Sequence, residues 1–250
     1  MNHAATIRVL QEPALDGPTN MARDEALMLR VGRSKSAPSL RLYQWDPPTI
    51  SLGYFQKYAD YESLPPPAGR LAVVRRLTGG GAILHDLELT YSLTLPTSHR
   101  VLADGANRLY ELAHDAVIAA LEDLEIESAR CGTTDDSSPS RGPFFCFARR
   151  HCFDVLIGAS KVTGSAQRRT REAILQHGSI ILANRFDQQP TAAVSLPFEQ
   201  SIQHVRRLFV EHLAKVTGEP FEPGEWTTEE LAAAESLTPK YAGAELNRRM

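Results

Sequence analysis

Residues 75–86 read Arg-Arg-Leu-Thr-Gly-Gly-Gly-Ala-Ile-Leu-His-Asp, directly after the apolar run of residues 71–74. Three successive glycines let the backbone come close to a ligand and turn N–H groups toward it, and the two arginines can neutralise an anion. Such a loop suits an acyl phosphate, an adenylate or a thioester oxygen, although a Gly-Gly-Gly stretch can also be a simple tight connection. The spacing matches neither the phosphate loop nor the dinucleotide fingerprint, so it does not predict an ordinary nucleotide-binding fold.

A second block lies further along the chain. Residues 158–167 read Gly-Ala-Ser-Lys-Val-Thr-Gly-Ser-Ala-Gln, and residues 176–179 read Gln-His-Gly-Ser. Residues 153–157, the Gly-Ala turn and the segment from Ser160 predict a hairpin that brings Lys161 onto a sheet, next to a close approach that glycine permits. A lysine there can have a lowered pKa or can stabilise developing negative charge. A solvated hairpin lysine is the alternative.

Hydrophobic periodicity predicts helices at residues 109–124, at 198–213 with Gly218 as the terminating glycine, and at 21–29 with Asn20 as the cap. Short β-branched or alternating runs predict strands. These runs are residues 40–45, 50–53, 71–75, 89–95, 153–157 and 179–182. Because strands and helices do not alternate regularly, the expected fold is α/β of the α+β kind, with a mixed, largely antiparallel sheet and packed helices.

The chain of 250 residues, 42% hydrophobic, suffices for one sizeable core, and we expect one domain over residues 1–250. Residues 132–143 predict a surface loop, and residues 218–224 a linker into a C-terminal tail over 219–250. The net charge of −3 gives no global reason to expect nucleic acid or a membrane as partner. With no signal-peptide pattern and no run of about 18 apolar residues, we expect a cytoplasmic protein.

The three cysteines, Cys131, Cys146 and Cys152, are few and odd in number. This suits free thiols in a reducing compartment better than disulfides. No C-x-x-C pair occurs and only His151 lies near, so we predict no metal site. A buried structural thiol is the alternative at each position.

The two glycine-containing blocks together resemble the signature pair of the lipoate–protein ligase and octanoyltransferase superfamily, which is related in fold to biotin–protein ligases. Residues 20–27, 43–45 and 53–56 resemble segments of the same superfamily in the same order, so the resemblance covers most of the chain. It implies a biotin/lipoate-protein-ligase-like catalytic domain with a site for an acyl group or adenylate. The substrate-binding residues it implies are Arg76, Gly79, Gly80, Gly81, Ala82, Ile83, Leu84, His85, Gly164, Ala166, Gln167, His177 and Gly178.

Members of this superfamily activate the acyl group in two ways: ligases form an adenylate from ATP, and transferases use an enzyme cysteine. Cys146, upstream of Lys161, stands where octanoyltransferases of the LipM type place their nucleophile, so the resemblance implies Cys146 and Lys161 as catalytic residues. The other octanoyltransferase type carries its cysteine where residues 194–197 read Val-Ser-Leu-Pro. Octanoyl amidotransferases place theirs nearer the hairpin, where Cys152 is too close to Asp154 to match.

Two departures keep an ATP-dependent ligase open as the alternative. The Pro-Ser pair expected between the nucleophile and Phe153-Asp154 is missing, and the third glycine of the loop is frequent in ligases. That alternative requires ATP and Mg, with Arg76 and residues 79–84 on the adenylate phosphate. The tail after Gly218 is too short for the accessory domain that classical ligases need, so such a ligase would use a separate chain. A third interpretation is a non-catalytic protein that binds lipoyl domains.

Basic residues concentrate in one segment of this acidic chain. Residues 141–171 carry a net charge of +6, with Asp154 as the single acid. The basic residues are Arg141, Arg149, Arg150, Lys161, Arg168, Arg169 and Arg171. A solvated face or a nucleic-acid site would explain this, but near a thioester site it suits acidic carrier proteins and lipoyl domains. We expect Arg168 and Arg169 to be exposed and to bind these partners.

The expected reaction moves an octanoyl group from octanoyl-acyl carrier protein to a lysine of a lipoyl domain or of the glycine-cleavage H protein. It passes through a Cys146 thioester and requires no metal and no ATP.

Overall fold

The computed structural model describes residues 6–134, 142–194 and 196–249. Its large sheet has the strand order β11-β1-β2-β6-β10-β9-β8-β7, and a small sheet has the order β4-β3-β5. In the large sheet β11, β1 and β2 pair in parallel, and the pairs from β2 to β7 are antiparallel. The prediction of a mixed, largely antiparallel sheet is confirmed.

The strands are β1 (Ile7–Leu15), β2 (Ser39–Trp45), β3 (Thr49–Leu52), β4 (Ala72–Arg75), β5 (Ile83–His85), β6 (Glu88–Pro96), β7 (Ala129–Arg130), β8 (Val155–Ile157), β9 (Ser160–Arg169), β10 (Ala173–Ile181) and β11 (Phe221–Pro223). The α-helices are α1 (Gly17–Gly32), α2 (Tyr58–Glu62), α3 (Arg108–Glu122), α4 (Phe198–Thr217), α5 (Thr228–Ala242) and α6 (Ala244–Asn247). Short 3₁₀ turns are η1 (Ala68–Arg70), η2 (Arg100–Leu102) and η3 (Cys146–Ala148). Within the described ranges no helix is long and apolar enough to cross a membrane.

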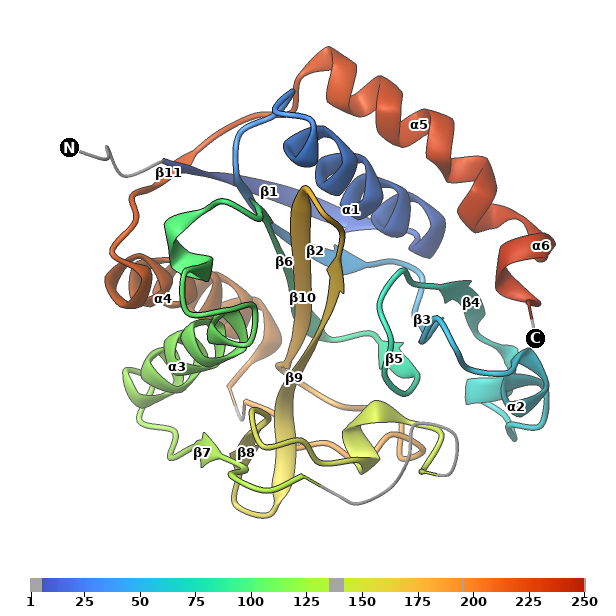
Figure 1. The fold of residues 1–250 in the computed structure, drawn as a ribbon. Coiled ribbons are helices and arrows are strands. Elements are labelled where there is room, and N and C mark those ends of the chain that lie inside the picture. The colour runs from blue at the N-terminus through green and yellow to red at the C-terminus, as the bar shows by residue number, and fades with distance from the viewer. Residues whose placement is uncertain (1–5, 135–141, 195, 250) are drawn as a thin grey trace.

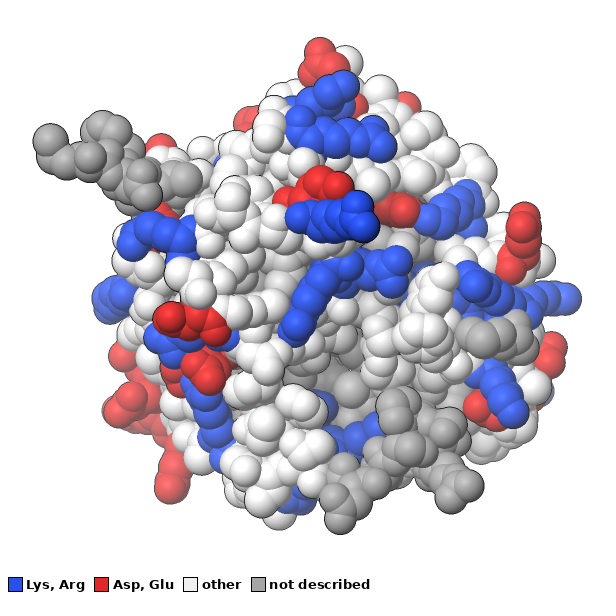
Figure 2. Space-filling view, in the orientation of Figure 1, with Lys and Arg blue, Asp and Glu red and all other residues white. Residues whose placement is uncertain are grey.

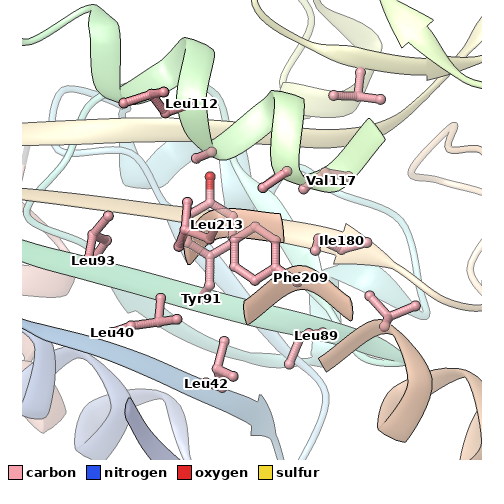
Figure 3. Packing of buried hydrophobic residues seen from close by; sticks show 14 of the residues in the cluster. Leu40, Leu42, Leu89, Tyr91, Leu93, Leu112, Val117, Ile180, Phe209 and Leu213 are labelled. Carbon is pink, nitrogen blue, oxygen red and sulfur yellow. The ribbon is translucent and has the colours of Figure 1, made fainter. Parts of the chain in front are cut away.

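Helices cover both faces of the large sheet, with α3 and α4 on one face and α1 and α5 on the other (Figure 1). The face under α3 and α4 holds the main core, in which Tyr91 of β6 packs on Phe209 of α4 with ring centroids 4.9 Å apart (Figure 3). Side chains alternate along β6. Leu89, Tyr91 and Leu93 therefore enter this core, while Thr90 and Ser92 point toward α1 and the candidate site.

The predicted helices α3 and α4 are confirmed, and α4 ends at Gly218, whose φ of 65° is left-handed. The predicted cap of α1 is wrong. Asp16 caps this helix by accepting a hydrogen bond from the Thr19 N–H at 2.8 Å. Asn20 lies inside the helix, where its amide donates to the carbonyls of Leu15 and Gln44, because these buried strand-end oxygens need a partner.

The segment predicted as a linker is part of the fold. β11 pairs with β1, and α5 then packs along α1. A capping box of Thr227 and Glu230 starts α5, and Glu230 also forms an ion pair with Arg8 at 2.6 Å. The Thr-x-x-Glu spacing was a usable sequence signal for this helix. Periodicity also missed β1 and the first part of β10, and residues 135–141 of the predicted surface loop lie outside the described residues.

Candidate active site

Cys146 is held against the glycine block by backbone pairing. The N–H of Cys146 donates to the Ala82 carbonyl at 2.7 Å, and the N–H of Ala82 donates to the Phe144 carbonyl at 2.9 Å. A Cβ on Gly81 would lie 2.9 Å from the Cys146 nitrogen, so only glycine permits this approach. The glycine block therefore sets the position of the cysteine.

Lys161 reaches Cys146 from β9. Its Nζ lies 3.7 Å from the Cys146 Sγ and 3.4 Å from the Cys146 carbonyl oxygen. The lysine side chain is buried because Gly164 leaves room for it: a Cβ on Gly164 would lie 2.4 Å from the Lys161 Cε. The predicted hairpin of β8 and β9 is thus confirmed, and it brings together the two residues that the resemblance implied as catalytic.

Asp154 completes the arrangement. Its Oδ2 lies 2.8 Å from the Lys161 Nζ and also accepts a hydrogen bond from the His151 N–H at 2.8 Å. Both charged side chains are almost wholly buried. Sequence reasoning gave Asp154 no role at the site; the signal available was an acid directly before the hairpin that carries the lysine.

Two anionic neighbours determine the charge of Lys161. Burial lowers the pKa of this lysine, but the Cys146 thiolate and the Asp154 carboxylate together raise it above its ordinary value. The alternative of a lowered lysine pKa is therefore wrong, because a buried amine with two anionic neighbours stays protonated. The site presents an ammonium group to the sulfur.

A cavity opens beside Cys146. Residues of the glycine block, of β9 and of β10 line it, and some of them are residues for which the resemblance implied substrate binding. Those predicted residues are Arg76, Gly80, Ile83, His85, Gly164, Ala166, His177 and Gly178. Sequence reasoning missed the remaining wall. It is formed by Met21, Tyr43, Trp45, Ser51, Thr90, Phe147, Ser165 and Ser179.

Five predicted substrate-binding residues do not line this cavity, and each has a contact within the protein. Gly79 accepts from Arg76 through its carbonyl, and Gly81 and Ala82 lie against the Cys146 segment. The backbone of Leu84 exchanges hydrogen bonds with the Gln189 side chain, and Gln167 donates to Ala106 and Gln176.

Arg76 lines the cavity, but its donors are engaged. Nε donates to Thr78, Nη1 to Ser51, and Nη2 to the carbonyls of Gly79 and Gly81 at 2.8 and 2.6 Å. Burial lowers its pKa to about 10, a nearby Cys146 thiolate opposes this, and the group remains charged at neutral pH. In this structure Arg76 therefore holds the glycine loop in shape.

Two histidines anchor the cavity wall. His85 stacks on Trp45 with centroids 3.8 Å apart and hydrogen-bonds Glu88 and Ser51, each at 2.7 Å. The Nε2 of His177 lies 2.7 Å from the Thr78 hydroxyl, which ties β10 to the glycine loop. Burial lowers the pKa of His177, although a hydrogen bond with Asp24 of α1 and the charge of that carboxylate oppose this. A neutral His177 suits a wall facing an apolar ligand.

The other thiols lie outside the cavity. The Cys152 Sγ is 3.9 Å from the His151 ring, the Cys131 Sγ is 3.6 Å from the Thr133 hydroxyl, and all three cysteines are free and partly exposed. The alternative of a buried structural thiol is therefore wrong for each cysteine. Within residues 6–134, 142–194 and 196–249, no three His, Cys, Asp or Glu side chains gather as a metal site.

The basic segment divides in space. Lys161 and Asp154 neutralise each other inside, and Arg141 lies outside the described residues. Arg168 and Arg169 are exposed at the end of β9, as predicted. Lys and Arg side chains gather over this part of the molecule and beside a hollow in its centre (Figure 2).

A residue from the chain end joins this surface. The guanidinium of Arg249 lies 5.0 Å from the centre of the Tyr54 ring, and that of Arg168 lies 5.7 Å from the same centre. Next to them Phe55 is 71% exposed. The N–H of Tyr54 donates to Thr78 of the glycine loop, so this surface adjoins the site. Sequence reasoning missed Arg249 because it is remote along the chain.

A cysteine sulfur beside a buried ammonium group, on the wall of a largely apolar cavity, is an arrangement that suits an enzyme of acyl transfer. The family model of the lipoyl protein ligase A/B catalytic domain matches residues 16–234, and the chain belongs to this family. The resemblance stated from the sequence is confirmed.

Two relatives of this chain are named as octanoyltransferases. The chain is 34% identical to the octanoyltransferase LipM of Kyrpidia tusciae, over 98% of this chain and 99% of that one. It is also 34% identical to the octanoyltransferase LipM of Moorella thermoacetica, with the same coverage. Among solved structures, it is similar to lipoate-protein ligase A bound with ATP, with a TM-score of 0.75 and 22% identity over 97% of this chain and 98% of that one. It is likewise similar to a bipartite lipoate protein ligase of Thermoplasma acidophilum, with a TM-score of 0.70 and 20% identity over 98% and 96%.

Proposed function

We propose that this protein is an octanoyltransferase. It moves an octanoyl group from the thioester of an acyl carrier protein to a lysine of a lipoyl domain or of the glycine-cleavage H protein. The observation that carries the proposal is the 3.7 Å separation of the Cys146 Sγ and the Lys161 Nζ beside the cavity. A neighbouring ammonium favours the thiolate, which is the nucleophilic form of cysteine.

In the first half-reaction the Cys146 thiolate attacks the carbonyl carbon of the donor thioester. The new C–S bond forms at Cys146, the donor C–S bond breaks, and the carrier thiol leaves and takes a proton. Lys161 stabilises the negative charge that develops on the oxygen. The apolar part of the cavity, with Met21, Trp45 and Phe147, receives the alkyl chain.

In the second half-reaction the ε-amine of the acceptor lysine attacks the Cys146 thioester. An amide bond forms, the C–S bond breaks, and the proton lost from the amine returns to solvent. Cys146 leaves as the thiolate that Lys161 stabilises, so the enzyme is ready for the next donor.

Both protein partners bind the surface formed by Arg168, Arg169, Arg249 and Phe55. Its arginines suit acidic carrier proteins and lipoyl domains, and Phe55 offers an exposed apolar contact. The glycine loop contacts both this surface and Cys146 through its backbone, so the thioester or lysine of a bound partner lies close to Cys146. Free, partly exposed thiols suit a reducing compartment, which supports the cytoplasm as the site of action.

The transfer needs neither ATP nor metal in this proposal. The ligase alternative requires Arg76 to bind an adenylate phosphate, and that role would break hydrogen bonds that its nitrogens make to the glycine loop. A cysteine mechanism leaves these hydrogen bonds between Arg76 and the glycine loop intact.

Intact mass measurement separates the two mechanisms. After incubation with octanoyl carrier protein, the wild-type chain should gain one octanoyl group that hydroxylamine removes, and Cys146→Ser should gain none. Octanoate or lipoate with ATP should leave both chains unchanged. Acceptor modification that needs ATP and survives Cys146→Ser would establish the ligase alternative instead.

A further inference from the structure

The buried amine of Lys161 could attack the thioester of the acyl-enzyme. Under the proposed function, Cys146 carries an octanoyl thioester whose carbonyl carbon is bonded directly to Sγ. Because Nζ lies 3.7 Å from Sγ, that carbon is within reach of the lysine. An unprotonated amine at this place would take the acyl group irreversibly, and the enzyme would inactivate itself.

Acylation removes one of the charges that keep Lys161 protonated. In the free enzyme the Cys146 thiolate and Asp154 both raise the pKa of Lys161 against the effect of burial. A thioester is neutral, so the sulfur's contribution disappears when the acyl group arrives. Asp154 then remains as the one carboxylate ion-paired to Lys161 in the described part of the chain.

We propose that Asp154 is a positioning residue that keeps Lys161 protonated in the acyl-enzyme and so prevents transfer of the octanoyl group from Cys146 to Lys161. This proposal rests on the octanoyl thioester proposed above. An ammonium group has no lone pair and cannot attack a carbonyl carbon, yet it still stabilises negative charge at the sulfur or at the carbonyl oxygen. The same contact therefore allows catalysis and blocks self-acylation.

The contacts of Asp154 suit this role. Besides its contact with Lys161, the Asp154 Oδ2 accepts a hydrogen bond from the His151 N–H. The backbone N–H of Asp154 donates to the His151 carbonyl at 2.8 Å, so His151 holds both the carboxylate and the backbone of Asp154. Two further titratable groups close to this pair, His114 and Tyr110, are neutral. Burial lowers the pKa of His114 to about 4 and raises that of Tyr110 to about 12. Neither supplies the negative charge that the lysine needs.

The blocked reaction would transfer the octanoyl group from the Cys146 sulfur to the Lys161 nitrogen. Lys161 would first lose a proton to solvent, and its Nζ lone pair would attack the thioester carbonyl carbon. A C–N bond would form and the C–S bond would break. Cys146 would leave as a thiolate, and the nitrogen would release its second proton to solvent. The product is an amide that hydroxylamine does not cleave.

The experiment compares wild type with Asp154→Asn, which keeps the shape and removes the charge. Each chain is acylated with octanoyl carrier protein and followed by intact mass and peptide mapping, with and without hydroxylamine. In wild type the octanoyl group should stay on Cys146. In the variant it should move to Lys161 at least about tenfold faster, because each unit by which the Lys161 pKa falls increases the neutral amine about tenfold. Asp123→Asn, an exposed carboxylate paired with His212, is the matched control and should behave as wild type.

The outcomes separate this proposal from the function on which it rests. A hydroxylamine-sensitive adduct that persists on Cys146 of Asp154→Asn, with no amide on Lys161, would overturn it. Absence of any thioester in wild type would instead overturn the proposed function. If the variant does not fold or acylate, purified wild-type acyl-enzyme is incubated at rising pH. An amide should then appear on Lys161 as the lysine loses its proton, and hydrolysis without that amide would contradict the proposal.

Discussion

The Lys161 Nζ lies 3.7 Å from the Cys146 Sγ, and the two residues come from different elements, β9 and the η3 turn. Neither element alone fixes this distance. The glycine block does so on one side, through the Ala82 backbone, and Gly164 does so on the other, by leaving space for the lysine stem.

We expect Cys146→Ser to abolish octanoyl transfer while leaving the fold intact. A serine hydroxyl is far less nucleophilic than a thiolate, and the backbone contact to Ala82 does not involve the side chain. Transfer to a lipoyl domain and a circular dichroism spectrum measure both effects. Cys131→Ser and Cys152→Ser are the controls and should keep their activity. Full activity in Cys146→Ser would contradict the thioester mechanism.

Lys161→Ala should slow acylation of Cys146 by at least about 100-fold, because the positive charge that favours the thiolate is lost. The rate of alkylation by iodoacetamide at fixed pH reports the thiolate independently of the substrate. This variant also leaves Asp154 unpaired near the sulfur. The double variant Lys161→Ala/Asp154→Asn removes that repulsion and should remain slow; a return to wild-type alkylation would mean that Lys161 only neutralises Asp154.

Gly81→Ala should lower transfer by on the order of ten- to a hundred-fold, because its Cβ would press on the Cys146 backbone 2.9 Å away and displace the nucleophile. Gly79→Ala is the matched control in the same loop, since no atom lies within 4 Å of a Cβ there. Acylation rates of the two variants give the comparison. Equal losses would show that loop flexibility matters more than this contact.

Changing both Arg168 and Arg169 to Ala should raise the apparent KM for carrier-bound octanoate and weaken its dependence on salt. Exposed charges act mainly on the rate of encounter and are screened by ions. The rate with octanoyl-CoA should stay nearly constant. Arg207→Ala, exposed on α4, is the control. Equal loss with both donors would place these arginines in the active site, and an unchanged KM would make them an ordinary solvated face.

His114 should make the fold sensitive to acid. Burial lowers its pKa from 6.5 to about 4, so between these values the unfolded chain binds a proton that the folded chain excludes. Stability should therefore fall as the pH decreases from 6.5 to 4, by up to roughly 1 kcal/mol per pH unit. Urea unfolding at several pH values should show a smaller fall for His114→Gln than for wild type. His204→Gln, an exposed residue of α4, should fall as wild type does; identical slopes in all three would contradict the assignment.

Local patterns predicted a substantial part of this protein. Periodicity located α3 and α4, because a helix that buries one face must repeat its apolar residues along that face. The hairpin of β8 and β9 followed from a glycine turn between two short runs. Spacing against a known superfamily paired Cys146 with Lys161, which the structure brings into contact. Periodicity did not identify β1, α5 or the true cap of α1, whose roles depend on partners far along the chain.

The sequence by itself determined the glycine block, the hairpin and the identity of the cysteine and lysine, since these depend on backbone freedom and on residue order. Only the tertiary structure decided the chemistry of the site. It placed Cys146 and Asp154 against the buried Lys161, so the lysine pKa is raised where a lowered one was an open alternative. It also directed the nitrogens of Arg76 to the loop and brought Arg249 to Tyr54. Burial and long-range charge pairing set these properties, and both arise from contacts between segments that no local pattern encodes.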